Sequence, residues 1–220
     1  MLRFETIETQ PNPEASIIFL HGLGANGFDL MNIVPSLAVP SSLSIRFIFP
    51  HAPMRPITLN NGMKMPGWFD ITGLTLNSRQ DLAGLEQARY QIDQLIEAEI
   101  KKGIKPEKIM LGGFSQGGAL SLFTGLQSVY PLAGLIVLSS YFPCVAKVEK
   151  NMSPLNKSIP IFIAHGTLDD VVRYEWGELA KKELARLGCG SIEWHEYPIA
   201  HEICLPELRD LSKFIIEKIS

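Results

Sequence analysis

The sequence is poor in cysteine. Its 220 residues include three, Cys144, Cys189 and Cys204. They lie far apart and none belongs to a Cys-x-x-Cys pair, which is unlike a disulfide framework or a cysteine-rich zinc site. Small, apolar, unpaired cysteines are typical of proteins from a reducing compartment. We therefore expect free thiols.

The chain also lacks a strong charge of one sign. Lys and Arg number 20, Asp and Glu number 23, and the formal net charge is −3. Like charges form no long block. This balance gives neither the basic footprint of a nucleic-acid-binding protein nor an acidic interaction tail. We therefore do not expect nucleic acid to be a partner.

Long apolar runs are missing as well. No segment reaches the ~18 apolar residues of a membrane-spanning helix, and the N-terminus has acidic residues instead of the apolar segment of a signal peptide. We expect a cytoplasmic protein without a transmembrane segment. Because 46% of the residues are hydrophobic, the chain can bury a substantial core. No repeat or linker divides the chain, so residues 1–220 are expected to form a single domain.

Short apolar runs alternate with helical patterns along the chain. The runs expected to be buried strands are 16–20, 45–49, 108–111, 135–138, 159–164 and, with weaker alternation, 191–197. The helical patterns cover 81–102, 117–125, 176–187 and 206–219. Continuous apolar strands between helices are typical of an α/β fold with a mostly parallel central sheet and helices on both faces.

Residues 51–78 depart from this alternation. They contain several prolines and an Asn-Asn-Gly turn, but also the apolar side chains of Met63, Met65, Trp68 and Phe69. A long irregular segment inside a compact domain usually has a function. We interpret it as a loop folded over the sheet, with these four side chains as candidates for lining a substrate groove. The alternative is that they simply cap the core.

One turn has the pattern of a nucleophile. Gly113-Phe114-Ser115-Gln116-Gly117 matches Gly-x-Ser-x-Gly between an expected strand and an expected helix, which is the context of a nucleophile elbow. Glycines two residues away let the strand and helix pass closely, and the helix N-terminus favours negative charge beside the serine. A glycine-rich turn with an incidental serine is the alternative. A phosphate-binding loop fits less well, because the Gly-Lys-Ser/Thr signature is absent.

A nucleophilic serine needs a base and an acid that orients the base. On this fold they follow in the order serine, acid, histidine. Asp169 and Asp170 both follow the expected strand 159–164 and are candidates for the acid, with Asp169 preferred. His201, in the loop after the last strand, is the candidate base. His165 closes the strand 159–164 and is expected to make a local hydrogen bond instead.

A glycine-containing loop, His21-Gly22-Leu23-Gly24, follows the first expected strand. Its glycines allow the backbone to approach a substrate. We expect the backbone N–H groups of Leu23 and of Gln116, the residue after the serine, to form an oxyanion hole. An ordinary glycine turn is the alternative for this loop.

The chain resembles the acyl-protein thioesterase/carboxylesterase family, the phospholipase/carboxylesterase group of the α/β-hydrolases. The segments that carry the resemblance are Leu20-His21-Gly22-Leu23-Gly24, Phe49-Pro50-His51-Ala52-Pro53, Gly67-Trp68-Phe69-Asp70, Gly112-Gly113-Phe114-Ser115-Gln116-Gly117-Gly118, His165-Gly166 with Asp169, and His201. The segment 56–62 is similar to the bacterial carboxylesterase-like branch. Asp170 and Arg173 stand where many members have proline.

The resemblance implies an α/β-hydrolase fold and a serine esterase or thioesterase that uses no metal or cofactor. It implies Ser115, Asp169 and His201 as a catalytic triad, with the Leu23 and Gln116 amides as the oxyanion hole. Since no separate lid domain fits within the chain, we expect an open site for short to medium acyl chains.

The natural substrate stays open between small esters, lysophospholipids and acylated proteins. An acyltransferase or a non-catalytic binding module on the same scaffold is a further alternative. Exposed apolar loops can also pair two copies into a homodimer.

Overall fold

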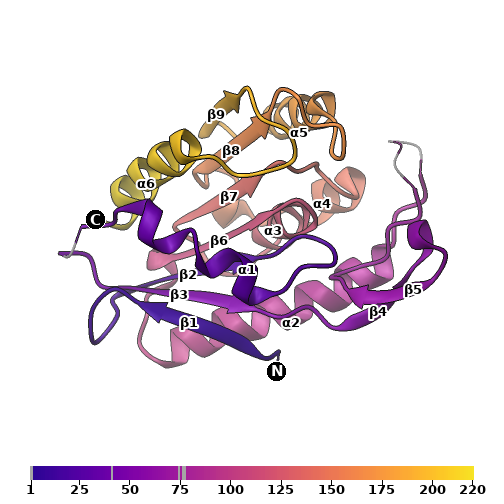
Figure 1. Cartoon of the computed structure of the whole chain (residues 1–220). Helices are drawn as coiled ribbons and strands as arrows, with labels where there is room; N and C mark the ends of the chain where they lie inside the picture. The colour runs from indigo at the N-terminus through magenta and orange to yellow at the C-terminus, as the bar shows by residue number, and fades with distance from the viewer. Residues whose placement is uncertain (1, 41, 74, 76–77) are drawn as a thin grey trace.

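The computed structural model describes residues 2–40, 42–73, 75 and 78–220. These residues form a seven-stranded sheet with the order β1-β3-β2-β6-β7-β8-β9 (Figure 1). Its strands are β1 (Phe4–Glu8), β2 (Ala15–Leu20), β3 (Ile45–Pro50), β6 (Ile109–Phe114), β7 (Gly134–Leu138), β8 (Ile161–Gly166) and β9 (Ile192–Tyr197). Neighbouring strands are parallel except β1, which is antiparallel to β3. The expected, mostly parallel sheet is confirmed.

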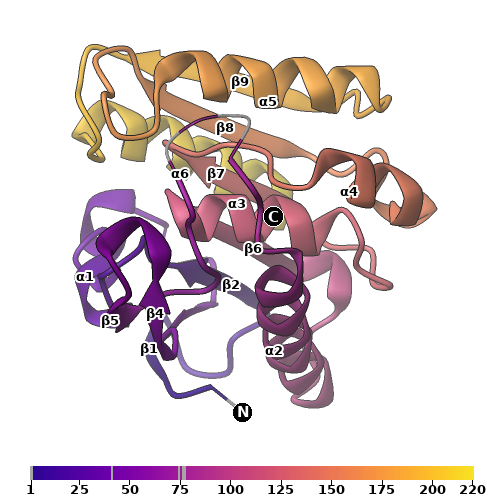
Figure 2. The same cartoon turned by 90° about the vertical axis from the view of Figure 1, so that its right-hand side faces the viewer.

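Helices cover both faces of the sheet (Figure 2). One face carries α1 (Gly27–Met31), the 3₁₀ helix η1 (Val34–Leu37) and α6 (Leu205–Ile219), and the other carries α2 (Leu82–Lys101), α3 (Gln116–Gly125), α4 (Val145–Asn151) and α5 (Tyr174–Arg186). Three further 3₁₀ turns are η2 (Thr58–Asn60), η3 (Pro106–Lys108) and η4 (Pro154–Asn156). Among the described residues, none of the helices is both long and apolar enough to cross a membrane.

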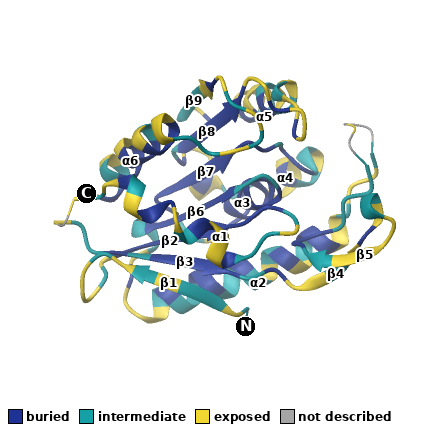
Figure 3. Cartoon of the chain, viewed as in Figure 1, coloured by how far each residue is buried: buried dark blue, intermediate teal, exposed yellow. Residues whose placement is uncertain are grey.

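The central strands are buried on both faces, as Figure 3 shows in dark blue. In β2, Ile17 and Phe19 pack toward α6, while Ile18 and Leu20 pack toward α2 and α3. Successive side chains of a strand point to opposite faces, so a strand covered on both faces is apolar at every position. This is the physical reason why these strands are recognisable as continuous apolar runs.

The expectation for residues 51–78 was wrong in part. Residues 54–66 do not lie as a loop over the main sheet. They contain a separate antiparallel hairpin of β4 (Met54–Ile57) and β5 (Met63–Pro66), which extends away from the sheet (Figures 1 and 2). The chain then returns to the core at Trp68 and Phe69, which are 1% and 3% exposed. Positions 74, 76 and 77 of the segment lie outside the described residues.

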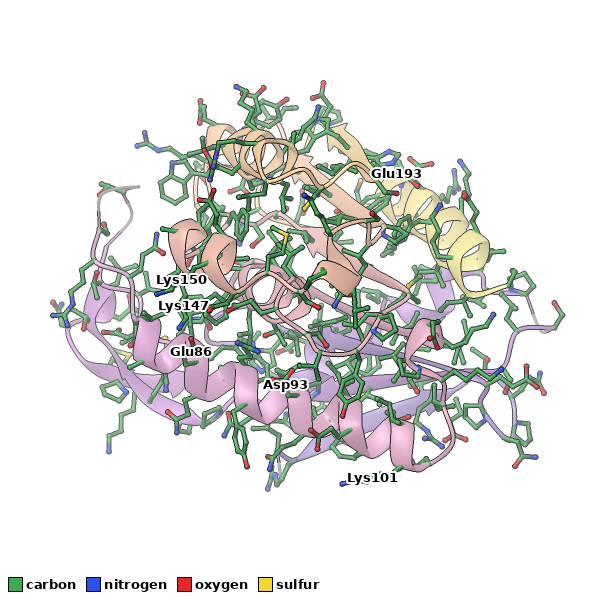
Figure 4. The ribbon with its side chains drawn as sticks, turned by 180° about the vertical axis from the view of Figure 1, so that it is seen from behind. Glu86, Asp93, Lys101, Lys147, Lys150 and Glu193 are labelled. Carbon is green, nitrogen blue, oxygen red and sulfur yellow. The ribbon has the colours of Figure 1, made fainter. Side chains whose placement is uncertain are left out.

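An ion pair links helix α4 to α2. Figure 4 shows Glu86, Asp93 and Lys101 along α2 and Lys147 and Lys150 on α4. The Lys147 Nζ lies 2.9 Å from the Glu86 Oε1. Both side chains are about a third exposed, so the contact contributes well under about 1 kcal/mol to stability. It joins α2 to a short helix whose first residue, Val145, lies beside the functional site.

Glu207, in the first turn of α6, makes the stability of the protein depend on pH. Its Oε2 accepts a hydrogen bond from the Cys204 N–H at 3.2 Å, and its Oε1 is buried without a partner among the described residues. Burial raises the pKa of this carboxyl to about 7, above the ~4.3 of an unfolded chain. The native state therefore binds more protons than the unfolded state between these values, so stability falls as the pH rises from about 4.3 to about 7 and changes no further above that.

We expect Glu207→Gln to remove this loss while keeping an oxygen acceptor for the Cys204 N–H. The difference in Tm between the variant and wild type should increase from pH 5 to pH 8. This increase corresponds to a change of up to about 3 kcal/mol in the relative free energy of unfolding. Thermal unfolding at both pH values measures it. Glu217→Gln, at the exposed end of the same helix, is the matched control. An equal pH dependence in Glu207→Gln and wild type would contradict the assignment.

Candidate active site

Ser115 lies in the tight turn between β6 and α3 with a backbone φ of +55° and ψ of −120°. A positive φ is unfavourable for a residue with a side chain. The turn is held by the surrounding structure, because the Ser115 N–H donates to the Leu138 carbonyl at 2.9 Å and its carbonyl accepts from the Ser140 Oγ at 2.6 Å. This conformation presents the Ser115 Oγ at the carboxyl edge of the sheet.

The glycines on either side of the turn are required by close packing. A Cβ on Gly113 would lie 2.4 Å from the carbonyl carbon of Gly117, and a Cβ on Gly117 would lie 2.1 Å from the carbonyl oxygen of Leu20. Neither distance leaves room for a side chain. The steric interpretation of the Gly-x-Ser-x-Gly pattern is therefore confirmed.

His201 stands between Ser115 and Asp169. Its Nε2 lies 3.0 Å from the Ser115 Oγ, and its Nδ1 lies 2.7 Å from the Asp169 Oδ2. A carboxylate can only accept, so Nδ1 carries the proton and Nε2 is free to accept the proton of the serine hydroxyl. The side chain of Asp169 is fully buried, whereas Asp170 is exposed. Of the two candidate acids, the structure brings Asp169 to the histidine.

The expected oxyanion donors are the backbone amides of Leu23 and Gln116. Neither N–H has a hydrogen-bond acceptor among the described residues. Leu23 and Gln116 both line the cavity that contains Ser115. Two unpaired amides beside a serine hydroxyl have the arrangement that stabilises negative charge on a reacting carbonyl oxygen.

His21 orients the first of these donors. Its Nδ1 lies 2.7 Å from the Gly22 carbonyl oxygen, which can only accept, and its Nε2 accepts from the Ala52 N–H at 3.0 Å. Nε2 can accept only when the ring is neutral, and burial, which lowers the pKa of His21, favours the same form. Because the peptide bond is trans, fixing the Gly22 carbonyl toward His21 turns the Leu23 N–H the opposite way.

The side chain of Gln116 ties the returning segment of the chain to the serine turn. Its Oε1 accepts from the Trp68 N–H at 2.9 Å and its Nε2 donates to the Phe69 carbonyl at 2.7 Å. The Trp68 indole N–H also donates to the His21 carbonyl at 2.8 Å. The sequence predictions gave Gln116 a role through its backbone alone. The signal for a second role is a glutamine at the start of a mostly apolar helix.

A cavity of about 600 Å³ opens at Ser115 and His201. This volume lies within the ~300–1,000 Å³ of small-molecule sites. Apolar side chains make up much of its wall; the larger ones are Leu23, Leu30, Ile33, Leu59, Phe69, Ile71, Leu85, Phe114, Tyr141, Phe142, Val145, Val171, Val172, Trp176, Leu179 and Ile203.

Three of the four side chains expected to line a groove are not part of this wall. Phe69 lines the cavity, but Trp68 is buried in the core against α2 and α3. Met63 lies on the hairpin with 64% of its surface exposed, and Met65 lies on the same strand outside the cavity. The reason is the hairpin, which carries both methionines away from the sheet.

The wall instead includes side chains from α5 and from the segment that enters α4. Tyr141, Phe142 and Val145 come from the second, and Trp176 and Leu179 from the first. Trp176 and Leu179 are three residues apart on a helix and therefore share a face. That spacing is the sequence signal for their role, although it looks the same as ordinary core packing.

Comparison with known proteins identifies the family to which this chain belongs. A family model described as phospholipase/carboxylesterase matches residues 2–219. The acyl-protein thioesterase 1 of Mycosarcoma maydis is 42% identical over 222 residues, which cover 94% of this chain and 92% of that protein. The acyl-protein thioesterase 1 of Neurospora crassa is 40% identical and covers 93% of this chain and 87% of its own.

Solved structures agree with this result. The Zea mays acyl-protein thioesterase 2 superposes with a TM-score of 0.89 at 26% identity and covers all of both chains. Arabidopsis thaliana SOBER1 superposes with a TM-score of 0.87 at 32% identity, over 94% of this chain and 99% of its own. The chain therefore belongs to the phospholipase/carboxylesterase family, and it is an α/β-hydrolase enzyme that cleaves carboxylic ester or thioester bonds.

Proposed function

We propose that Ser115, His201 and Asp169 are the catalytic triad of this hydrolase and that the Leu23 and Gln116 amides form its oxyanion hole. The observation that carries the proposal is the pair of contacts that links the three side chains, 3.0 Å from serine to histidine and 2.7 Å from histidine to aspartate. These distances lie within the range for proton transfer between a nucleophile and its base.

In the proposed reaction, the His201 Nε2 removes the hydroxyl proton as the Ser115 Oγ attacks the acyl carbonyl. The carbonyl oxygen becomes an anion held by the two backbone N–H groups. The bond to the alcohol or thiol then breaks, and the protonated His201 donates its proton to the leaving group. Water, activated by His201, attacks the acyl-serine and releases the carboxylic acid. Asp169 keeps the imidazole in the required tautomer throughout.

The apolar wall of the cavity supports an acyl chain as the bound part of the substrate. We propose short to medium chains, with the leaving group directed to the open side. Relatives named acyl-protein thioesterase favour an acylated protein as the natural substrate. A lysophospholipid, which presents the same acyl ester, is the second candidate. We also propose that residues 1–220 act as one domain.

A series of p-nitrophenyl esters from acetate to dodecanoate tests the function, together with matched acyl thioesters. We expect kcat/KM to pass through an optimum as the chain lengthens, because each added methylene buries apolar surface until the cavity is filled. The product should be the free carboxylic acid. Equal kcat/KM at every chain length would contradict an acyl-binding cavity. Acyl transfer to an added alcohol in place of acid formation would favour an acyltransferase.

A further inference from the structure

A second histidine, His165, lies beside the proposed triad without being part of it. It is in β8, and its side chain is fully buried. Its Nε2 lies 2.7 Å from the Val172 carbonyl oxygen. Because that oxygen can only accept, Nε2 carries the proton. Burial lowers the pKa of His165, which keeps the ring neutral.

The carbonyl that His165 holds belongs to the turn that carries Asp169. The Asp169 Oδ1 accepts from the N–H groups of Val171 and Val172, at 2.9 and 2.8 Å. The carboxylate is therefore anchored to the residue whose carbonyl is bound to His165. The His165 Nε2 also lies 3.5 Å from the Asp169 Oδ2, the oxygen that faces His201.

The opposite edge of the His165 ring is pressed against α5. A Cβ on Gly177 would lie 2.3 Å from the His165 Nδ1, so α5 can approach the ring only because this position has no side chain. Glycine weakens a helix interior relative to alanine, and close approach to His165 is a physical reason for its presence here. The ring is thus fixed between α5 and the Asp169 turn.

We propose that His165 is a positioning residue for this active site, which acts by fixing the turn 169–172 and through it the carboxylate that orients His201. The inference rests on the proposed function, since it assigns His165 a role through Asp169. His165 does not touch the reacting atoms. Val172, whose carbonyl it binds, also lines the cavity, so the same contact holds part of the cavity wall.

Two substitutions distinguish the effect of the His165 N–H donor from the effect of the ring volume. His165→Phe removes the N–H and keeps a ring, whereas His165→Gln offers an amide N–H near the position of Nε2. In His165→Phe we expect kcat to fall by roughly 10–100-fold, because small displacements of a catalytic group have effects of this size. The KM should change by less than about threefold, and His165→Gln should recover most of kcat.

The pH profile distinguishes positioning from a merely structural role. With Asp169 displaced, the imidazolium of His201 loses part of its stabilisation, so the acid limb of the kcat/KM profile should move to lower pH in His165→Phe. The rates are expressed per active site, counted by titration with a covalent serine reagent. His195→Phe, on the neighbouring strand and stacked on Phe162, is the matched control and should leave kcat and the acid limb unchanged.

Wild-type kcat per active site and an unmoved acid limb in His165→Phe would overturn the proposal. If that variant does not fold, Gly177→Ala replaces it, because a Cβ there pushes on the same ring. It should lower kcat and move the acid limb in the same direction, and an unchanged profile would overturn the proposal. Retained esterase activity in Ser115→Ala would instead show that the proposed triad itself is wrong.

Discussion

Replacing Ser115 by alanine should lower kcat by roughly 10⁶-fold, the typical loss when the nucleophile of a catalytic triad is removed. The chemical reason is that the acyl-enzyme requires an oxygen at this position, and no other hydroxyl is hydrogen-bonded to His201 among the described residues. Hydrolysis of the preferred p-nitrophenyl ester, compared with a blank without enzyme, measures the effect. A covalent serine reagent should label wild type once and should not label the variant.

Ser121→Ala is the matched control for this experiment. Ser121 lies on the helix that follows the turn, and among the described residues its Oγ donates only to the Gly117 carbonyl, at 2.8 Å. We expect kcat within about twofold of wild type, since this contact lies within the helix and away from the reacting groups. Activity retained by Ser115→Ala at the level of Ser121→Ala would reject Ser115 as the nucleophile.

Asp169→Asn should lower kcat by roughly 10⁴-fold near neutral pH. The amide can still accept the N–H groups of Val171 and Val172 through its oxygen, so the turn is preserved. Its NH₂ group then faces the His201 Nδ1 and donates to it. The histidine must place its proton on Nε2, the nitrogen that has to accept the proton of Ser115, and it cannot act as the base.

Asp170→Asn is the matched control, because the two residues are adjacent and only Asp169 contacts His201. Asp170 is exposed, and its substitution should leave kcat within about twofold of wild type. Steady-state kinetics and thermal unfolding of both variants provide the comparison. An inactive Asp170→Asn together with an active Asp169→Asn would contradict the assignment of Asp169 as the acid that orients His201.

Most of the strands that the sequence reveals are those that helices cover on both faces. β2 is apolar at almost every position for this reason, and β6, β7 and β8 follow the same rule. The edge strand β9 (Ile192–Tyr197) was found from a weaker alternation. β1 was not predicted from apolar runs, because it is a half-exposed edge strand with the sequence Phe-Glu-Thr-Ile-Glu. The hairpin strand β4 is hidden for another reason, since Pro56 lies inside it and proline is unfavourable in most strands.

Part of the site can likewise be predicted from the sequence, and part cannot. Ser115 and His201 are found from motif and chain order, because the fold requires them after particular strands. The choice between Asp169 and Asp170 depends on which side chain the turn directs inward, and neighbouring identical residues carry no such information. The cavity wall depends on which segments meet in space. Trp176 and Leu179 of α5 therefore escaped prediction, and Met63 was placed there in error.

The two hydrogen bonds of the Gln116 side chain fix the point at which the chain returns from the hairpin to the core. The segment from Pro53 to Gly67 begins and ends next to residues that are hydrogen-bonded to His21 and Gln116. These residues are Ala52 before the segment and Trp68 and Phe69 after it. A Cβ on Gly62, at the tip of the hairpin, would meet nothing within 4 Å, so changes at the tip should leave the serine turn in place. Leu59 and Pro66 are different, because Leu59 lines the cavity and the Pro66 carbonyl accepts from the Gly24 N–H at 2.8 Å. The tip of the hairpin is therefore a part of the surface that can be rebuilt while the proposed catalytic centre stays unchanged.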